Sequence, residues 1–153
     1  MGSAGGVAPF HVAFPVGDLD ASRAFYGGVL ELEEGRRSER WQDYSLFGHQ
    51  IVCHLVDGYH ASGASNAVDG DPVPVPHFGV CLAVDDFHAF ASKLKAKGVA
   101  FEIEPHLRFQ GHPGEQWTMF FKDPSGNALE FKAMTTPENL FATYAVPTQP
   151  SSK

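Results

Sequence analysis

The sequence predicts an α+β protein built from two β-α-β-β-β modules, which pair into a curved mixed sheet with a metal-binding hollow on its helix-free side. Three observations predict this class. An apolar strand headed by a histidine and followed by an acidic helix start occurs twice, at His11 and at His77. The offset of 66 residues is close to half of the 153-residue chain. Apolar residues make up 43% of the chain, which is typical of a globular domain.

The first module is expected over residues 9–56. Apolar and polar residues alternate over 10–16, which predicts a strand with one buried face. Asp18 or Asp20 can cap a helix that runs to about residue 27. Three strands are predicted to follow, at 32–39, 41–47 and 49–56.

The second module, expected over residues 77–134, repeats this order. A strand at 77–84 leads into a helix at about 86–97, whose apolar residues recur at helical spacing. Gly98 is expected to end this helix. Three strands complete the module, at 100–104, 116–122 and 128–133.

The remaining segments are predicted to connect or flank the modules. Residues 57–76 are rich in Gly, Ser, Asp and Pro, which predicts a linker. Residues 105–115 interrupt the second module as an inserted loop. Residues 1–8 are expected to be a disordered N-terminus and residues 135–153 a C-terminal tail.

Charge and composition restrict the possible partners. The formal net charge of -7 disfavours nucleic acid and anionic membranes as partners. No apolar run approaches the roughly 20 residues of a membrane span, and the first residues lack the features of a signal peptide. Cys53 and Cys81 fall in predicted strands and are expected to be buried thiols without a disulfide. We therefore expect a cytoplasmic protein that acts on a small molecule.

The strand period predicts which side chains face the hollow. His11, His77 and Glu130 each fall on the strand face that carries the smaller residues. Two imidazoles and one carboxylate form the 2-His-1-carboxylate triad, which leaves coordination positions open and is typical of Fe(II). Mn(II) or Zn(II) would bind the same set. A histidine at a strand start is also a common surface residue, and the pattern alone leaves both interpretations open.

Three stretches of the chain are distinctive together: HVAFPVGDLDASRAFYGGVL at 11–30, HFGVCLAVDDFHAFASKLKAKGV at 77–99 and FFKDPSGNALEFKA at 120–133. They resemble the vicinal oxygen chelate superfamily, which groups glyoxalase I, bleomycin-resistance proteins and type I extradiol dioxygenases. The chain is most similar to small single-domain proteins described as predicted extradiol-type dioxygenases. In these families the metal ligands open the first strand of each module and sit in the final strand. The resemblance therefore implies His11, His77 and Glu130 as ligands.

The strand at 49–56 separates the members of this superfamily. Glyoxalase I resembles this layout but places a carboxylate there, whereas the hollow-facing positions here are Gln50, Val52 and His54. Extradiol dioxygenases keep an acid–base histidine in the corresponding strand, which His54 matches by order and face. A partly buried, hydrogen-bonded histidine is the alternative interpretation. The Tyr that extradiol enzymes carry in the penultimate strand is missing, and Tyr44, expected to face the hollow, is the candidate substitute.

The inserted loop supplies the candidate substrate-binding residues. His106 and Arg108 lie where extradiol enzymes keep substrate-contacting polar groups, and Arg108 would suit a carboxylate. Glu115 is expected to support this site or to be an ordinary surface acid. The resemblance thus implies a homodimeric enzyme that uses Fe(II) and O2 to cleave a catechol-like or other vicinal-oxygen compound.

Two alternatives remain open from the sequence. One is a glyoxalase-like isomerase or lyase that uses Ni(II) or Zn(II), which the missing carboxylate at 49–56 disfavours. The other is a metal-free protein that binds an antibiotic or another small molecule. Known bleomycin-binding relatives lack the three ligands, which disfavours that interpretation.

Overall fold

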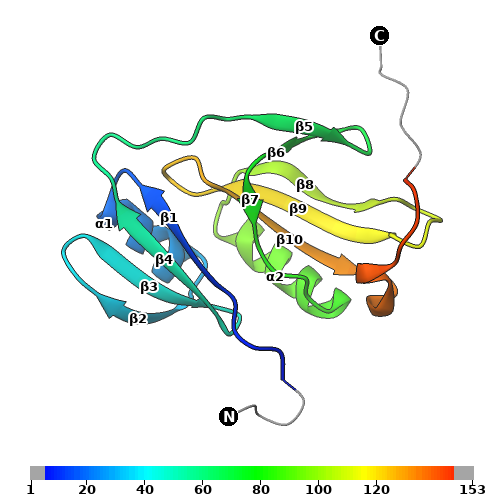
Figure 1. Cartoon of the computed structure of the whole chain (residues 1–153), viewed down its shortest axis with the longest axis horizontal. Helices are drawn as coiled ribbons and strands as arrows, with labels where there is room; N and C mark the ends of the chain where they lie inside the picture. The colour runs from blue at the N-terminus through cyan, green and yellow to red at the C-terminus, as the bar shows by residue number, and fades with distance from the viewer. Residues whose placement is uncertain (1–5, 147–153) are drawn as a thin grey trace. The chain divides into compact units, whose positions relative to one another are not determined.

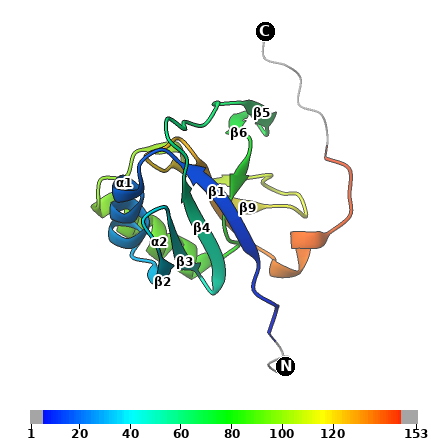
Figure 2. The same cartoon turned by 60° about the vertical axis from the view of Figure 1, so that its left-hand side comes forward.

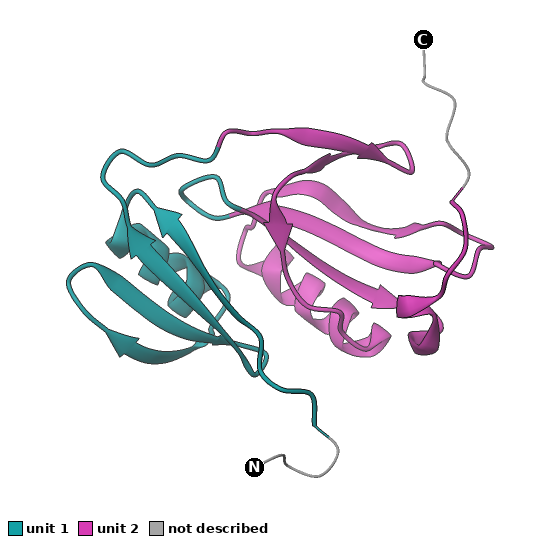
Figure 3. Ribbon diagram, viewed as in Figure 1, with its two compact units in different colours: residues 1–61, 123–127 teal, residues 62–122, 128–153 magenta. Residues whose placement is uncertain are grey.

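The computed structural model describes residues 6–146, and within them the chain divides into two compact units (Figures 1 and 3). Unit 1 comprises residues 1–61 and 123–127, and unit 2 comprises residues 62–122 and 128–153. The predicted α+β class is confirmed. Residues 1–5 and 147–153, parts of the predicted N-terminus and tail, lie outside the described residues. Among residues 6–146, none of the helices has the length and apolar character that a membrane crossing needs.

Unit 1 contains a four-stranded sheet in the order β1-β4-β3-β2. β1 and β4 are parallel, and the other neighbouring strands are antiparallel. A short helix and a wider helical turn cover one face of the sheet (Figure 2). These elements are β1 (His11–Val16), α1 (Leu19–Arg23), η1 (Ala24–Val29), β2 (Glu33–Arg37), β3 (Trp41–Leu46) and β4 (His49–Leu55).

The sequence explains how this helical segment begins and why it packs. The carboxylate of Asp18 accepts a hydrogen bond from the backbone N–H of Ala21 at 2.9 Å and so caps the first turn. From Ala24 onward the helix widens into a π-helical turn, which the sequence did not predict. This turn buries Tyr26 completely, with its ring centroid 5.7 Å from that of Phe14 and 5.8 Å from that of Tyr44. The helix-facing side of the sheet is therefore the core of unit 1.

The turn 123–127, which joins two strands of unit 2, belongs to unit 1. One carboxylate oxygen of Asp123 accepts hydrogen bonds from the backbone N–H groups of Ser125 and Asn127, both at 2.9 Å. The other accepts one from the hydroxyl of Tyr26 at 2.8 Å. The side-chain amide of Asn127 donates to the carbonyl of Pro15 at 2.8 Å. The Asp-Pro-Ser-Gly-Asn motif is thus structural, and it closes unit 1.

Unit 2 contains a second four-stranded sheet, in the order β7-β10-β9-β8. A 13-residue helix covers one face of it and buries the apolar residues predicted at helical spacing (Figure 1). These elements are β7 (His77–Phe78), α2 (Val84–Ala96), β8 (Phe101–Arg108), β9 (Gln116–Lys122) and β10 (Ala128–Met134). A 3-10 helix, η2 (Pro137–Phe141), follows in the segment predicted as a tail.

The strand predicted at 77–84 is much shorter than expected. Regular pairing covers only His77 and Phe78, and an isolated bridge at Cys81 continues beside β10. At Gly79 the backbone passes so close to the carbonyl of Glu130 that no Cβ would fit there. The prediction of two buried thiols is correct for Cys53 and wrong for Cys81, which is exposed beyond this irregular stretch.

The predicted linker 57–76 contains a hairpin that the sequence analysis missed. Its strands are β5 (Ser65–Val68) and β6 (Asp71–Pro74). Asp69 and Gly70 join them with positive φ angles of 45° and 84°, and Asp-Gly is a strong hairpin signal. Val73 packs against Ile103 and Phe120, so the hairpin covers part of the helix-free face of unit 2.

Candidate metal centre

His77 and Glu130 meet on the helix-free face of unit 2. His77 pairs with Ala128 in the parallel β7–β10 ladder, so Glu130 follows two residues later on the same face. Nε2 of His77 lies 3.0 Å from a carboxylate oxygen of Glu130. Both residues line a surface pocket together with Gly79, Cys81 and Lys132. Strand alternation predicted this pair correctly as neighbours of one face.

The remaining polar atoms of this pair are also bonded. Nδ1 of His77 lies 2.7 Å from the carbonyl oxygen of Pro74, which can only accept, so Nδ1 carries a hydrogen. The hydroxyl of Thr118 donates to the second carboxylate oxygen of Glu130 at 2.8 Å. Nε2 of His77 and one oxygen of Glu130 therefore remain directed at each other, as two donors of a metal site would be.

The electrostatics of the pair are those of an ion pair. The hydrogen bond with Glu130 raises the pKa of His77 above its ordinary value, against the opposing effect of desolvation. Burial acts to raise the pKa of Glu130, but hydrogen bonds from His77 and Thr118 and the charge of Lys132 bring it below its ordinary value. These shifts favour the charged forms of both side chains, and a metal ion bound by Nε2 of His77 would have to displace that proton.

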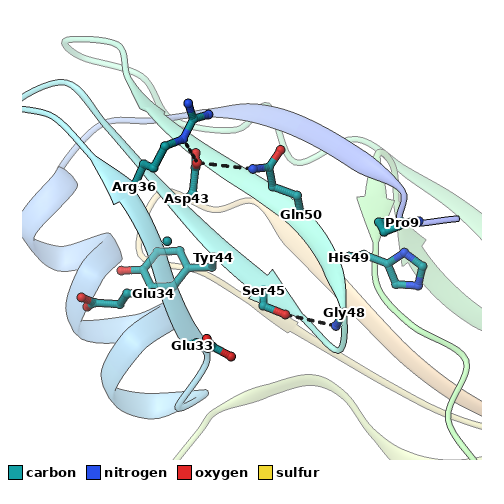
Figure 4. A pocket seen from close by; sticks show the side chains of 11 residues that line it. Pro9, Glu33, Glu34, Arg36, Asp43, Tyr44, Ser45, Gly48, His49 and Gln50 are labelled. Carbon is teal, nitrogen blue, oxygen red and sulfur yellow. Dashed lines mark hydrogen bonds and ion pairs between the residues drawn. The ribbon is translucent and has the colours of Figure 1, made fainter. Parts of the chain in front are cut away.

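His11 has a corresponding environment in unit 1. It pairs with Gln50 in the parallel β1–β4 ladder, and its Nδ1 lies 2.7 Å from the side-chain oxygen of Gln50. The amide nitrogen of Gln50 donates in turn to Asp43 at 3.3 Å (Figure 4). The Nε2 of His11, like that of His77, is therefore left to accept a proton or a metal.

The donor chemistry of these residues fits a divalent metal, because neutral imidazole and carboxylate are ligands for Fe(II), Mn(II) and Zn(II). In unit 2 the possible donors His77 and Glu130 are adjacent, and in unit 1 His11 is an imidazole on the helix-free face. Within either unit, residues 6–146 hold no group of three or more His, Cys, Asp or Glu side chains placed to bind a metal. The ligand set of His11, His77 and Glu130 stays a prediction.

His54 and Tyr44 lie on opposite faces of the unit 1 sheet. His54 is exposed and shares the helix-free face of β4 with Gln50, as predicted by alternation. The expectation that Tyr44 faces the hollow is wrong. Tyr44 stands directly opposite Ile51, is 1% exposed and packs against Tyr26 on the helix side. Burial raises the pKa of its hydroxyl to about 12, and this hydroxyl has no hydrogen-bond partner within the described residues.

His106 and Arg108 belong to strand β8 rather than to a loop, which corrects the expected boundary. Nε2 of His106 lies 3.0 Å from Asp71 on the β5–β6 hairpin, and Arg108 donates to the same oxygen at 2.9 Å. Arg108 is only 4% exposed. Both side chains therefore hold the hairpin.

Glu115 closes the loop that follows β8. Its carboxylate accepts a hydrogen bond from the backbone N–H of Gly111 at 2.9 Å. The interaction is local, within the loop between β8 and β9. Glu115 thus has a structural role in this loop.

Three polar residues that hold predicted site residues in place were missed by the sequence analysis: Asp43, Thr118 and Asp71. Thr118 of β9 stands opposite Lys132 of β10, two residues from Glu130 and on the same face, so the pairing of the two strands would have predicted its contact with Glu130. The position of Asp43 could be predicted only from the register of β3 against β4, in which Asp43 stands opposite Val52. The contacts of Asp71 could be predicted only with the β5–β6 hairpin, and the signal for that hairpin in the sequence is its Asp-Gly turn.

Comparisons with known proteins agree with the resemblance read from the sequence. Residues 9–131 match the family described as the Glyoxalase/Bleomycin resistance protein/Dioxygenase superfamily. A glyoxalase/bleomycin resistance protein/dioxygenase from Alicyclobacillus acidocaldarius is 32% identical, with a TM-score of 0.73, over 88% of this chain and 96% of that one. A search of curated proteins gave no match.

More distant structures share the fold alone. The fosfomycin resistance protein FosX from Listeria monocytogenes is 22% identical, with a TM-score of 0.61, over 92% of this chain and all (100%) of that one. A lactoylglutathione lyase from Agrobacterium tumefaciens is 19% identical, with a TM-score of 0.58, over 91% of this chain and 99% of that one. With its two β-α-β-β-β modules and the matching sequence over residues 9–131, the chain belongs to the glyoxalase/bleomycin resistance/dioxygenase superfamily.

Proposed function

We propose that this protein is a metal-dependent enzyme that binds two vicinal oxygens of a small substrate, and specifically an extradiol-type ring-cleaving dioxygenase. One observation carries the proposal. His77 and Glu130 turn donor atoms toward each other at 3.0 Å in a surface pocket, while their other polar atoms are already bonded. Membership of the superfamily supports it, because most members are metal-dependent enzymes.

His77, Glu130 and His11 are the proposed ligands, for Fe(II) first and for Mn(II), Zn(II) or Ni(II) as alternatives. A bound divalent ion would supply the positive charge that neutralises an enediolate or catecholate. Hydrogen bonds donated by Nδ1 orient both imidazoles, so that Nε2 of each ring is the nitrogen available to a metal, the arrangement found around most metal-binding histidines. Thr118 holds the carboxylate of Glu130 in place.

His54 is the proposed acid–base residue. It is exposed on the helix-free face of β4, where it would take a proton from a substrate hydroxyl and return it to the product. Tyr44 is not part of this proposal, because its ring is buried on the other face. We assign His106 and Arg108 to holding the hairpin rather than to contacting the substrate.

The helix-free positions of β4 favour the dioxygenase over a glyoxalase-like isomerase. Gln50, Val52 and His54 occupy them, so this strand offers no carboxylate as a fourth ligand or a base. Under the proposal, O2 is the second substrate and both of its atoms enter the cleaved ring of a catechol-like compound. A cytoplasmic homodimer is the proposed working form, because proteins of the superfamily are often dimers.

Anaerobic loading with Fe(II), followed by metal analysis and oxygen uptake with a panel of catechols, tests the proposal. The wild-type protein should bind one ion and consume O2, and the His77→Ala and Glu130→Ala variants should do neither. His112→Ala is the matched control, since His112 is exposed in the loop before β9.

Each other outcome identifies a different function. Metal binding with isomerisation of a hemithioacetal but no O2 uptake would indicate a glyoxalase-like enzyme. Antibiotic binding that is equal in the wild-type protein and both variants, without metal, would indicate a sequestering protein. Equal metal content in the wild-type protein and His77→Ala would remove the basis of the proposal.

A further inference from the structure

The helix-free face of unit 1 carries a row of hydrogen-bonded side chains that ends on His11. We propose that Asp43 is a positioning residue: through Gln50 it selects the imidazole tautomer of His11 that leaves Nε2 free. The consequence for metal affinity rests on the proposed function, whereas the tautomer itself does not. Two distances define the row, 3.3 Å from Gln50 to Asp43 and 2.7 Å from Gln50 to His11.

The strand register places these side chains next to one another. Gln50 of β4 stands opposite His11 of β1. Asp43 of the neighbouring strand β3 stands opposite Val52, two residues further along β4 and on the same face as Gln50. Asp43 is only 4% exposed, so its position is set by packing. Its carboxylate points toward the Gln50 amide (Figure 4). The row is therefore built into the sheet.

The carboxylate of Asp43 determines the direction of the hydrogen bonds in the row. An ionised carboxylate only accepts hydrogen bonds, so it selects the NH2 end of the Gln50 amide. The oxygen end of that amide must then face His11, and an amide oxygen also only accepts. Nδ1 of His11 therefore carries the hydrogen, and Nε2 keeps its lone pair. Without Asp43 the Gln50 amide could rotate by half a turn, and His11 would adopt either tautomer.

The charge of Asp43 is balanced nearby. Nε of Arg36 lies 3.3 Å from the same carboxylate oxygen that Gln50 contacts. A buried carboxylate without such partners would be costly. Arg36 itself is 80% exposed, so it supplies charge without fixing the geometry.

Unit 2 reaches the same tautomer by a simpler route. Nδ1 of His77 donates to the backbone carbonyl of Pro74 at 2.7 Å, the same distance as in unit 1. A backbone carbonyl cannot exchange its acceptor for a donor, whereas a side-chain amide can. Only the unit 1 histidine therefore needs a second group behind its partner.

The first test is the tautomer in metal-free protein, measured from the imidazole nitrogen and carbon chemical shifts of His11 at a pH where the ring is neutral. The wild-type ring should carry its hydrogen on Nδ1. Asp43→Asn should give a mixture of tautomers and lower Mn(II) affinity, measured by calorimetry, by about 10-fold to 100-fold. The double variant Asp43→Asn/Gln50→Glu should restore both, because Asn donates to Glu and Glu accepts from His11.

Asp20→Asn is the matched control, since it removes the same charge from a side chain of unit 1 that is 98% exposed. A wild-type ring with its hydrogen on Nε2 overturns the proposal, even where Asp43→Asn fails to fold. The proposal is also overturned if Asp43→Asn keeps the wild-type tautomer and Mn(II) affinity. It is likewise overturned if the double variant folds but recovers neither the tautomer nor the affinity. His11→Ala separates the two proposals: unchanged Mn(II) affinity in that variant rejects the ligand set and leaves the tautomer result standing.

Discussion

Unit 1 and unit 2 place a histidine at the same position of their parallel strand pair, yet they surround it differently. His11 stands opposite Gln50, and His77 stands opposite Ala128. Two residues later on the same face, unit 2 has Glu130 and unit 1 has Val52. The modules therefore share one imidazole position, but only unit 2 carries a carboxylate at the position two residues further along. This difference is what limits the proposed ligand set to three and leaves coordination positions for a substrate.

The two cysteines give the largest expected difference between the units. Cys53 in unit 1 is fully buried, and burial raises the pKa of its thiol, whereas Cys81 in unit 2 is exposed. A thiol reagent should label Cys81 at least roughly 1,000-fold faster, because Cys53 reacts only when the unit opens. Mass spectrometry during labelling measures both rates, because Cys81→Ala reports Cys53 alone and the wild-type protein reports both thiols. Comparable rates at the two sites would mean that unit 1 opens far more readily than its packing implies.

Equivalent positions of the two units are expected to differ in metal binding. Glu130→Ala should lower Mn(II) affinity by more than about 100-fold. Mutating a residue that is merely hydrogen-bonded to a metal ligand already costs about 10-fold to 100-fold in metal affinity, and Glu130 is itself a proposed ligand. Val52→Ala, at the corresponding position of unit 1, should leave the affinity unchanged. Calorimetry on folded protein measures both. Equal losses in the two variants would show that the proposed asymmetry of the ligands is wrong.

The turn 123–127 tests how strongly unit 1 depends on a segment whose flanking strands belong to unit 2. Tyr26→Phe removes the buried hydroxyl that donates to Asp123. We expect the free energy of unfolding to fall by about 1–3 kcal/mol, since a buried carboxylate loses one of its donors. Urea titration followed by circular dichroism measures the change. No measurable change would mean that the other donors to Asp123 suffice.

Tyr44→Phe is the smallest expected effect and serves as the contrast to Tyr26→Phe. The Tyr44 hydroxyl is buried without a hydrogen-bond partner in the described structure, so its removal should be neutral or stabilising by up to about 1 kcal/mol. The same urea titration applies. Oxygen uptake should also be unaffected, and its loss would return Tyr44 to the catalytic site.

Strand alternation predicted much of the candidate site from the sequence. His77, Glu130, Gln50 and His54 all lie on the faces that the period of two assigned to them. Alternation failed at Tyr44 because Gln42, Asp43 and Tyr44 are all buried, so the burial of β3 has no simple period. There, only the ladder with β4 determines which face is the core.

Contacts between segments distant in the sequence could not be predicted in the same way. His106 and Arg108 were correctly identified as polar residues of interest, but their partner Asp71 lies 37 residues from Arg108 on an unpredicted hairpin. The tautomers of His11 and His77 depend on Gln50 and on the Pro74 carbonyl. Such partners are set by tertiary structure, which local propensity does not encode.

The turn 123–127 also determines whether the chain can be cut into two complete modules. Cutting the chain between β4 and β5 would yield an N-terminal fragment without the residues that bond the Tyr26 hydroxyl and the Pro15 carbonyl. That fragment would expose part of its own interior to water. The first repeat therefore depends on residues 123–127, which the chain supplies only within the second repeat, so a division at the linker would not separate two complete modules.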